Sequence, residues 1–169
     1  SQSFAHLQLV HPNEQRRIGE LGIYTVFTYV WIRPDSEYDA MVIPFVDEVK
    51  GLEDMYNPDH YFMENVYPAK SIQDAGGVLV FGSDTPVGTR DPIPFYSMQQ
   101  AITRSNDEVT YNESQRLNVH DVIASYTING AHLFGREAEL GSLEVGKLAD
   151  IIVLDRNIVK LAEEGKANQ

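Results

Sequence analysis

The start of the chain contains the feature that most constrains its fold: two strand-like segments joined by one short helix. Apolar and polar residues partly alternate over residues 3–9, and Ile23 to Ile32 is rich in β-branched and aromatic residues. Between them, Pro12 favours a helix start and Gly22 a helix end. Strand, helix and strand within about thirty residues form a βαβ unit, which predicts two parallel neighbouring strands.

A third strand is predicted over Val78 to Phe81, a compact apolar run typical of a strand buried on both faces. It follows a short helix over residues 68–75 and ends abruptly in Gly82-Ser83-Asp84-Thr85-Pro86. Further helices are expected over Phe95 to Arg104 and from the capping residue Asn118 through Ser125. The helical pattern fades at Asn129-Gly130.

Two regions do not fit this alternation of strands and helices. Residues 33–60 carry prolines and many acidic residues, which indicates a long insertion or lid. Near the other end, turn-forming glycines precede Ala149 to Asp155, which we expect to be a buried strand, and the polar tail from Ala162 to Gln169 should be frayed. Three β/α units are fewer than the eight of a closed barrel, so we expect the chain to be the end of a larger α/β structure.

Composition excludes several classes of function. The chain has no cysteine, so a metal site would have to use histidine, aspartate or glutamate. The formal net charge of −12 makes nucleic acid and anionic membrane surfaces poor partners. No run of about 20 apolar residues and no secretory signal is visible, and the lack of cysteine fits a reducing compartment. We therefore expect a cytoplasmic protein whose partners are neither nucleic acid nor membranes.

Three residues near predicted strand ends are candidates for a site, because functional groups in parallel α/β folds gather where strands end. Asp84 directly follows the third strand, where a bound cation could offset its desolvation; alternatively, it only caps a turn. His6 lies within a strand-like run and is either a metal ligand or an ordinary rim residue. Trp31 either packs in the core or walls a substrate pocket.

Several segments together resemble the amidohydrolase superfamily of metal-dependent hydrolases, in particular the branch that includes N-substituted formamide deformylase and related exoenzyme-like amidohydrolases. The matching segments keep the family order, and the most specific is the last. They are Ala5-His6-Leu7-Gln8-Leu9-Val10-His11-Pro12, Gly82-Ser83-Asp84-Thr85-Pro86-Val87, Asp91-Pro92, Ala101-Ile102-Thr103-Arg104, Tyr126-Thr127-Ile128-Asn129-Gly130-Ala131 and residues 140–155.

The resemblance implies that residues 1–135 are the last three or so units of a (β/α)8 barrel, and that residues 136–169 are part of a small β-sandwich with a tail. It implies that His6 is a metal ligand of the sixth strand, and that Asp84, ending the eighth, binds metal and handles the proton of the attacking water. Trp31 would follow the seventh strand and contact substrate together with Thr85 and Arg90. The implied reaction is hydrolysis of an amide-type C–N bond with a divalent metal, for which zinc is the expected ion.

The chain also departs from the family pattern. The paired histidines of the first strand, the bridging lysine and the fifth-strand histidine have no counterpart. Two ligands are fewer than the three that a catalytic zinc normally keeps. We therefore expect these 169 residues alone to be inactive, to bind metal weakly or not at all, and to associate with themselves or with the missing part of the barrel. The alternative hypothesis is a stand-alone, non-catalytic α/β module that binds a ligand or partner.

Overall fold

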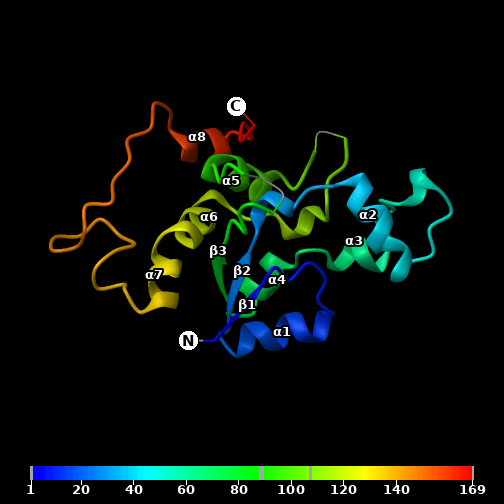
Figure 1. The fold of residues 1–169 in the computed structure, drawn as a ribbon, viewed down its shortest axis with the longest axis horizontal. Coiled ribbons are helices and arrows are strands. Elements are labelled where there is room, and N and C mark those ends of the chain that lie inside the picture. The colour runs from blue at the N-terminus through cyan, green and yellow to red at the C-terminus, as the bar shows by residue number, and fades with distance from the viewer. Residues whose placement is uncertain (1, 88–89, 107, 169) are drawn as a thin grey trace.

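A parallel three-stranded sheet forms the centre of the molecule (Figure 1). The computed structural model describes residues 2–87, 90–106 and 108–168. The strands β1 (Ser3–Ala5), β2 (Tyr24–Phe27) and β3 (Val78–Phe81) lie in the order β1-β2-β3. Phe4 pairs with Thr25, which pairs with Leu79. The predicted parallel βαβ unit is confirmed, although the first two strands are shorter than the sequence pattern indicated.

The helix α1 (Pro12–Glu20) connects the first two strands and packs against α4 (Ala69–Asp74). Its start is stabilised by the side chain of His11, whose Nδ1 accepts a hydrogen bond from the backbone N–H of Asn13 at 3.2 Å. Where the two helices meet, a Cβ on Gly19 would lie 2.4 Å from the Cβ of Ala75. Only glycine therefore permits this approach of α1 to the end of α4.

The third strand is buried on both sides, as predicted. Leu79 and Val80 are consecutive, so their side chains point to opposite faces of the sheet, and both are buried. The helices α5 (Pro94–Thr103), α6 (Val119–Tyr126) and α7 (Ile128–Phe134) follow, and both α6 and α7 contact β3. The α5 and α6 predictions are confirmed, including the cap in which Asn118 Oδ1 accepts from the backbone N–H of Asp121 at 2.9 Å.

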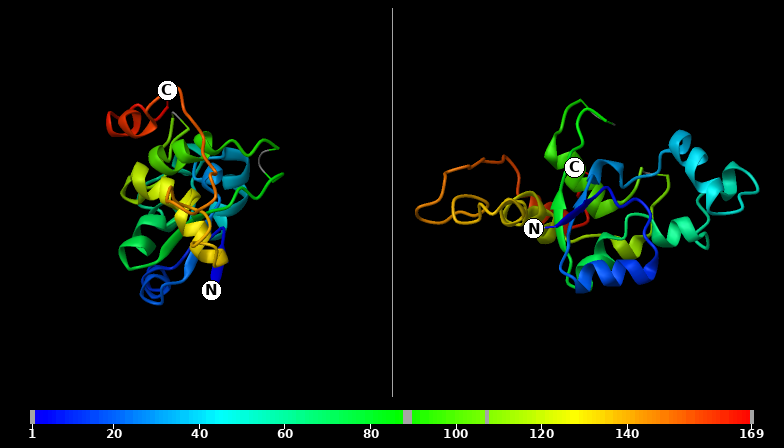
Figure 2. Two further views of the ribbon diagram at one scale, coloured as in Figure 1. Left: turned by 90° about the vertical axis from the view of Figure 1, so that its left-hand side faces the viewer. Right: turned by 60° about the horizontal axis from the view of Figure 1, so that its bottom comes forward.

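The segment from residue 33 to residue 60 is irregular, as the sequence indicated. It contains α2 (Ser36–Val42) and two 3₁₀ turns (Ile43–Phe45 and Leu52–Asp54), and it leads into α3 (Tyr61–Asn65). Figure 1 shows α2 and α3 at one end of the molecule, away from the loop that follows α7 at the other end, and the right view of Figure 2 shows the same separation.

Two sequence predictions near the end of the chain were wrong. The helical pattern does not fade at Asn129-Gly130, because α7 spans this pair. The strand expected over residues 149–155 is absent: within the described part of the chain, residues 149–155 form neither strand nor helix, and they are largely exposed. A strand needs a partner for its backbone hydrogen bonds, and no described segment pairs with this one. No strand forms in the described residues 136–168, so the expected β-sandwich segment stays a prediction.

The final helix, α8 (Ile158–Glu163), returns to pack against α6 (Figure 1). The tail predicted to be frayed from residue 162 is thus helical at its start. None of the helices in the described ranges is both long enough and apolar enough to span a membrane.

Candidate functional site

Three of the residues singled out from the sequence lie beyond the carboxyl ends of the strands. His6 directly follows β1, Trp31 ends the 3₁₀ turn (Tyr29–Trp31) that follows β2, and Asp84 comes three residues after β3. The register extends past the strands, since the N–H of His6 donates to the oxygen of Val26 at 2.9 Å. Because β1 and β3 both flank β2, the backbones at their ends are separated by about 10 Å.

The two predicted metal ligands share an unusual backbone conformation. His6 has φ of 68° and Asp84 has φ of 50°, both in the left-handed region that residues other than glycine seldom occupy. Such residues cost of order 1–3 kcal/mol each and cluster at functional sites. Both residues come after the carboxyl ends of strands of the same sheet, which marks that side of the sheet as a candidate site.

The His6 side chain is held by its neighbours on the sheet. Its imidazole ring stacks on the indole of Trp31, with ring centroids 5.1 Å apart and an interplanar angle of 21°. Its Nδ1 lies 3.4 Å from the hydroxyl of Thr28, a contact near the long limit of a hydrogen bond. The stacking holds the plane of the imidazole ring against the indole.

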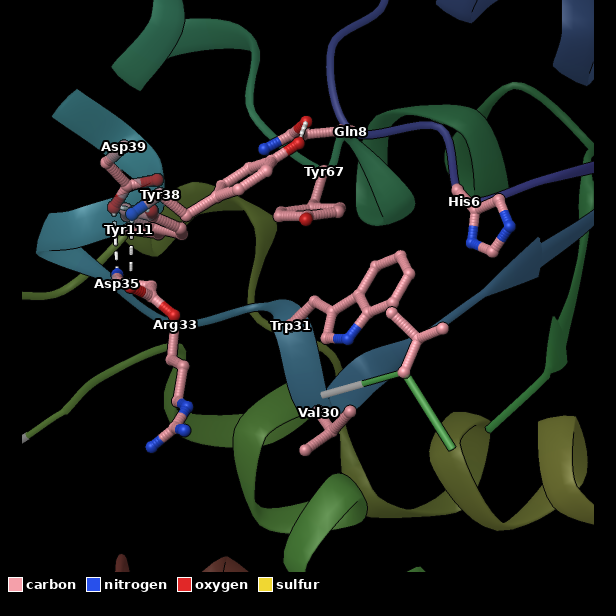
Figure 3. A pocket seen from close by; sticks show the side chains of 11 residues that line it. His6, Gln8, Val30, Trp31, Arg33, Asp35, Tyr38, Asp39, Tyr67 and Tyr111 are labelled. Atoms are coloured by element: carbon pink, nitrogen blue, oxygen red, sulfur yellow. Dashed lines mark hydrogen bonds between the residues drawn. The ribbon is translucent and has the colours of Figure 1, made fainter. Parts of the chain in front are cut away.

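A cavity of about 540 Å³ opens beside His6 and extends towards α2. In Figure 3, Trp31 lies between His6 on one side and Asp35, Asp39 and Tyr111 on the other, with the ring of Tyr67 near the indole. The aromatic and apolar walls are Trp31, Tyr38, Tyr67, Tyr111, Val30 and Val87, and the polar walls are His6, Gln8, Arg33, Asp35 and Asp39. A concave site with mostly aromatic walls and a few polar groups is typical of a small-molecule site.

The carboxylate of Asp39 is the most buried acidic group of the cavity wall, with 1% of the residue exposed. Its Oδ2 accepts hydrogen bonds from the hydroxyl of Tyr111 at 2.5 Å, from the hydroxyl of Tyr56 at 2.8 Å and from the N–H of Asp35 at 2.8 Å. Burial raises the pKa of Asp39 above its ordinary value, and the three donors only partly oppose this. The hydrogen bond between Asp39 and Tyr111 connects α2 to the loop after α5.

A second buried group, the guanidinium of Arg104, fixes two of the aromatic walls. Arg104 donates to the carbonyl oxygens of Tyr111 (2.8 Å), Tyr67 (3.1 Å) and Val66 (2.7 Å), and it is fully buried. Burial lowers the pKa of Arg104 to about 9, so the group keeps its proton at neutral pH. The backbones at Tyr67 and Tyr111 are therefore both held by hydrogen bonds to the same guanidinium.

The structure brings together only some of the predicted site residues. His6 and Trp31 share the cavity wall, whereas Asp84, Thr85 and Arg90 are exposed and are not among its lining residues. In the ranges that the structure describes, no group of three or more histidines, cysteines, aspartates or glutamates is arranged to hold a metal ion. Imidazole and carboxylate are suitable zinc ligands by type, but these described residues alone do not complete a site.

Other cavity residues were missed by the sequence reasoning. Asp39 is one of many acidic residues in the segment 33–60, and nothing in its spacing distinguishes it from the exposed ones. Tyr67 and Tyr111 are far from each other in sequence and meet the cavity through the contacts of Arg104. Gln8 lies in a segment that resembles the family, two residues after His6. This position is the one sequence feature that could have identified it as a site residue.

A parallel sheet flanked by helices, with a cavity where its strands end, gives the chain an α/β fold with a candidate ligand site. A sequence profile described as the Amidohydrolase family matches residues 2–168. The chain belongs to the amidohydrolase family.

Individual relatives agree with this assignment. N-substituted formamide deformylase of Arthrobacter pascens is 36% identical over 104 residues, which are 57% of this chain and 18% of that protein. Among solved structures, a metal-dependent hydrolase of Pyrococcus horikoshii matches with a TM-score of 0.68 and 21% identity, over 96% of this chain and 30% of that one.

An adenosine deaminase of Xanthomonas campestris with bound zinc matches with a TM-score of 0.56 and 22% identity, over 88% of this chain and 27% of that one. The chain thus spans between about a fifth and a third of the length of these relatives. The structural matches establish a shared fold over that portion.

Proposed function

We propose that this chain provides the last strands and part of the active site of a metal-dependent amidohydrolase that cleaves a C–N bond other than a peptide bond. In this proposal β1, β2 and β3 are consecutive strands of a (β/α)8 barrel. The observation that carries it is the placement of His6 and Asp84, both with left-handed backbones, where the two strands flanking β2 end. The family match over residues 2–168 supports it.

His6 and Asp84 would hold a divalent ion, for which zinc is the first candidate since a structurally similar deaminase binds it. A bound ion would lower the pKa of a water molecule and polarise the substrate carbonyl. The Asp84 carboxylate would accept the proton of the attacking water as the C–O bond forms, and would then return it to the amine nitrogen as the C–N bond breaks. The ring of Trp31 keeps the His6 imidazole in one orientation.

Thr85 and Arg90, in the exposed loop after Asp84, are proposed to contact the substrate from the loop side. A catalytic zinc keeps three protein ligands and a water, and the described residues offer two. We therefore also propose that the 169 residues do not hydrolyse amides without ligands from outside them.

The test is made on the natural polypeptide that carries this chain, loaded with zinc and assayed for amine release from simple formamides. Asp84→Asn should lower kcat by about 100-fold or more because it removes the proton acceptor. His6→Ala should lower both the bound zinc, measured by elemental analysis, and the activity. The matched controls Asp150→Asn and His120→Ala change exposed residues of the same types and should leave both unchanged.

Two results would contradict the proposal. One is an Asp84→Asn enzyme with wild-type activity. The other is unchanged amide hydrolysis after the metal has been removed with a chelator. The first would exclude Asp84 as the proton acceptor, and the second would exclude metal-dependent hydrolysis. Absence of amide hydrolysis by the zinc-loaded polypeptide would instead favour a non-catalytic binding module.

A further inference from the structure

The cavity is larger than the reacting group of an amide requires. Of the two residues proposed to hold the metal, only His6 borders it, and the rest of its 540 Å³ extends from Trp31 to α2. The space therefore accommodates a part of the substrate that is not itself cleaved. In enzymes, contacts to such remote parts determine which substrate is accepted.

Four aromatic rings line this space: Trp31, Tyr38, Tyr67 and Tyr111. Figure 3 shows the indole of Trp31 in the middle of the cavity wall, with the ring of Tyr67 near it. Aromatic rings prefer offset-stacked or edge-to-face contacts with other rings, so walls of this kind favour a flat, aromatic occupant over a puckered aliphatic one of equal size.

The walls are formed before any ligand arrives. Tyr67 and Tyr111 are 3% and 1% exposed, and Arg104 binds the backbone carbonyl of each. The N–H of Tyr67 donates to the oxygen of Gln8 at 2.7 Å, and the Tyr111 hydroxyl is bound to Asp39. Walls held in this way lose little conformational freedom on binding, which favours affinity.

One polar group is placed to orient the occupant. The Oε1 of Gln8 accepts a hydrogen bond from the hydroxyl of Tyr38 at 3.0 Å, which fixes the orientation of the carboxamide. Within the described residues, the Gln8 amide nitrogen has no protein partner, although it belongs to the cavity wall. Figure 3 shows this carboxamide beside Tyr38, on the side of the cavity away from His6, where its nitrogen is available to contact an occupant.

We propose that this cavity binds a neutral aromatic substituent of the amide substrate, stacked against Trp31, with Tyr38 and the Gln8 carboxamide bordering that substituent. The inference rests on the proposed function, because it takes the cleaved amide to lie at the His6 end of the cavity. In this arrangement Tyr38, from the segment 33–60, and Gln8 determine specificity.

Trp31 is the only tryptophan of the chain, so its fluorescence reports directly on the cavity. The 169-residue chain is titrated, with a chelator present, with N-phenylformamide and with N-cyclohexylformamide, which differ in the flatness of the ring but little in size. We expect saturable quenching by the phenyl compound and an affinity at least about threefold weaker for the cyclohexyl compound.

Two exposed or half-buried wall residues are then changed. Tyr38→Ala and Gln8→Ala should each weaken binding of the phenyl compound about three- to tenfold. The matched control Phe134→Ala removes an exposed aromatic side chain that does not line the cavity and should leave the affinity unchanged. Circular dichroism checks that each variant is folded.

Equal affinity for the two compounds, quenching that does not saturate, or variants that bind as the wild type does would each overturn the inference. The assay contains no metal and no hydrolytic step. Its failure would therefore leave the proposed metal-dependent hydrolysis standing, and failure of the hydrolysis test would leave a measured aromatic site standing.

Discussion

At the scale of single residues, the cavity depends on two buried ionisable groups that no catalytic proposal uses. Asp39 receives three hydrogen bonds at one oxygen, and Arg104 donates to three backbone carbonyls. Both groups connect segments far apart in sequence, and leaving such donors or acceptors unpaired costs about 1–3 kcal/mol. Together they determine where the rings of Tyr67 and Tyr111 stand.

The raised pKa of Asp39 predicts a pH dependence of stability. The native state holds the Asp39 proton to higher pH than the unfolded chain, whose aspartates titrate near pH 4. This contribution to the free energy of unfolding is therefore complete below the unfolded pKa and is lost as the pH rises through the native pKa.

We expect Asp39→Asn to remove this component, so that the stability of the wild type falls relative to the variant from about pH 4 upward. Urea unfolding at a series of pH values measures the difference. Asp59→Asn, which changes an exposed carboxyl of the same segment, should follow the wild type. Parallel curves for Asp39→Asn and the wild type would show that the Asp39 proton is not coupled to folding.

At the scale of elements, contacts between helices and strands determine structure that local sequence patterns do not predict. Asn129 donates from its Nδ2 to the carbonyl oxygen of Leu79 in β3 at 2.8 Å. This contact holds the start of α7 against the edge strand, in a stretch where asparagine and glycine alone would favour a turn. Gly19 similarly permits the packing of α1 on α4.

Two helical glycines should respond in opposite directions to alanine. In Gly19→Ala the new Cβ would meet the Ile72 oxygen at 2.7 Å and Ala75 at 2.4 Å, and we expect a loss of about 1–3 kcal/mol. In Gly130→Ala the nearest atom is 3.9 Å away, so the higher helix propensity of alanine should add about 0.5–1 kcal/mol. Urea denaturation compares both; a neutral or stabilising Gly19→Ala would contradict the packing described here.

At the scale of the whole molecule, the apolar segment between α7 and α8 is exposed. Ile152 and Val153 are 72% and 94% exposed, and Leu143 and Val145 are also uncovered. Figure 1 shows this segment as an extended loop on one side of the molecule. Contiguous exposed apolar residues of this kind mark contact surfaces.

We expect the 169-residue chain to self-associate through this segment as its concentration rises. Val153→Asp places a carboxylate on the apolar surface and should shift the chain towards the monomer, as measured by size-exclusion chromatography with light scattering. Asn106→Asp adds the same charge in the polar loop after α5 and should not change the distribution. A wild-type chain that stays monomeric at all concentrations would contradict the expectation.

The sequence predicted more of the fold than of the candidate site. The βαβ unit, the buried strand at residues 78–81 and the Asn118 cap were predictable because each depends on local periodicity or a capping side chain. The predicted strand over residues 149–155 failed because strand formation requires a partner that apolar residues alone do not supply. The metal roles of His6 and Asp84 and the contacts of Thr85 and Arg90 stay predictions.

The sequence by itself determined the parallel βαβ unit, the buried third strand and the residues that come after each strand, because these follow from short-range patterns. Only the tertiary structure decided that His6 stacks on Trp31, that Asp39 is buried while nearby acidic residues are exposed, and that Asp84 faces solvent outside the cavity. The reason is physical: burial and hydrogen bonding are properties of segments that meet in space, and the contacts of Asp39 and Arg104 join residues up to 72 positions apart.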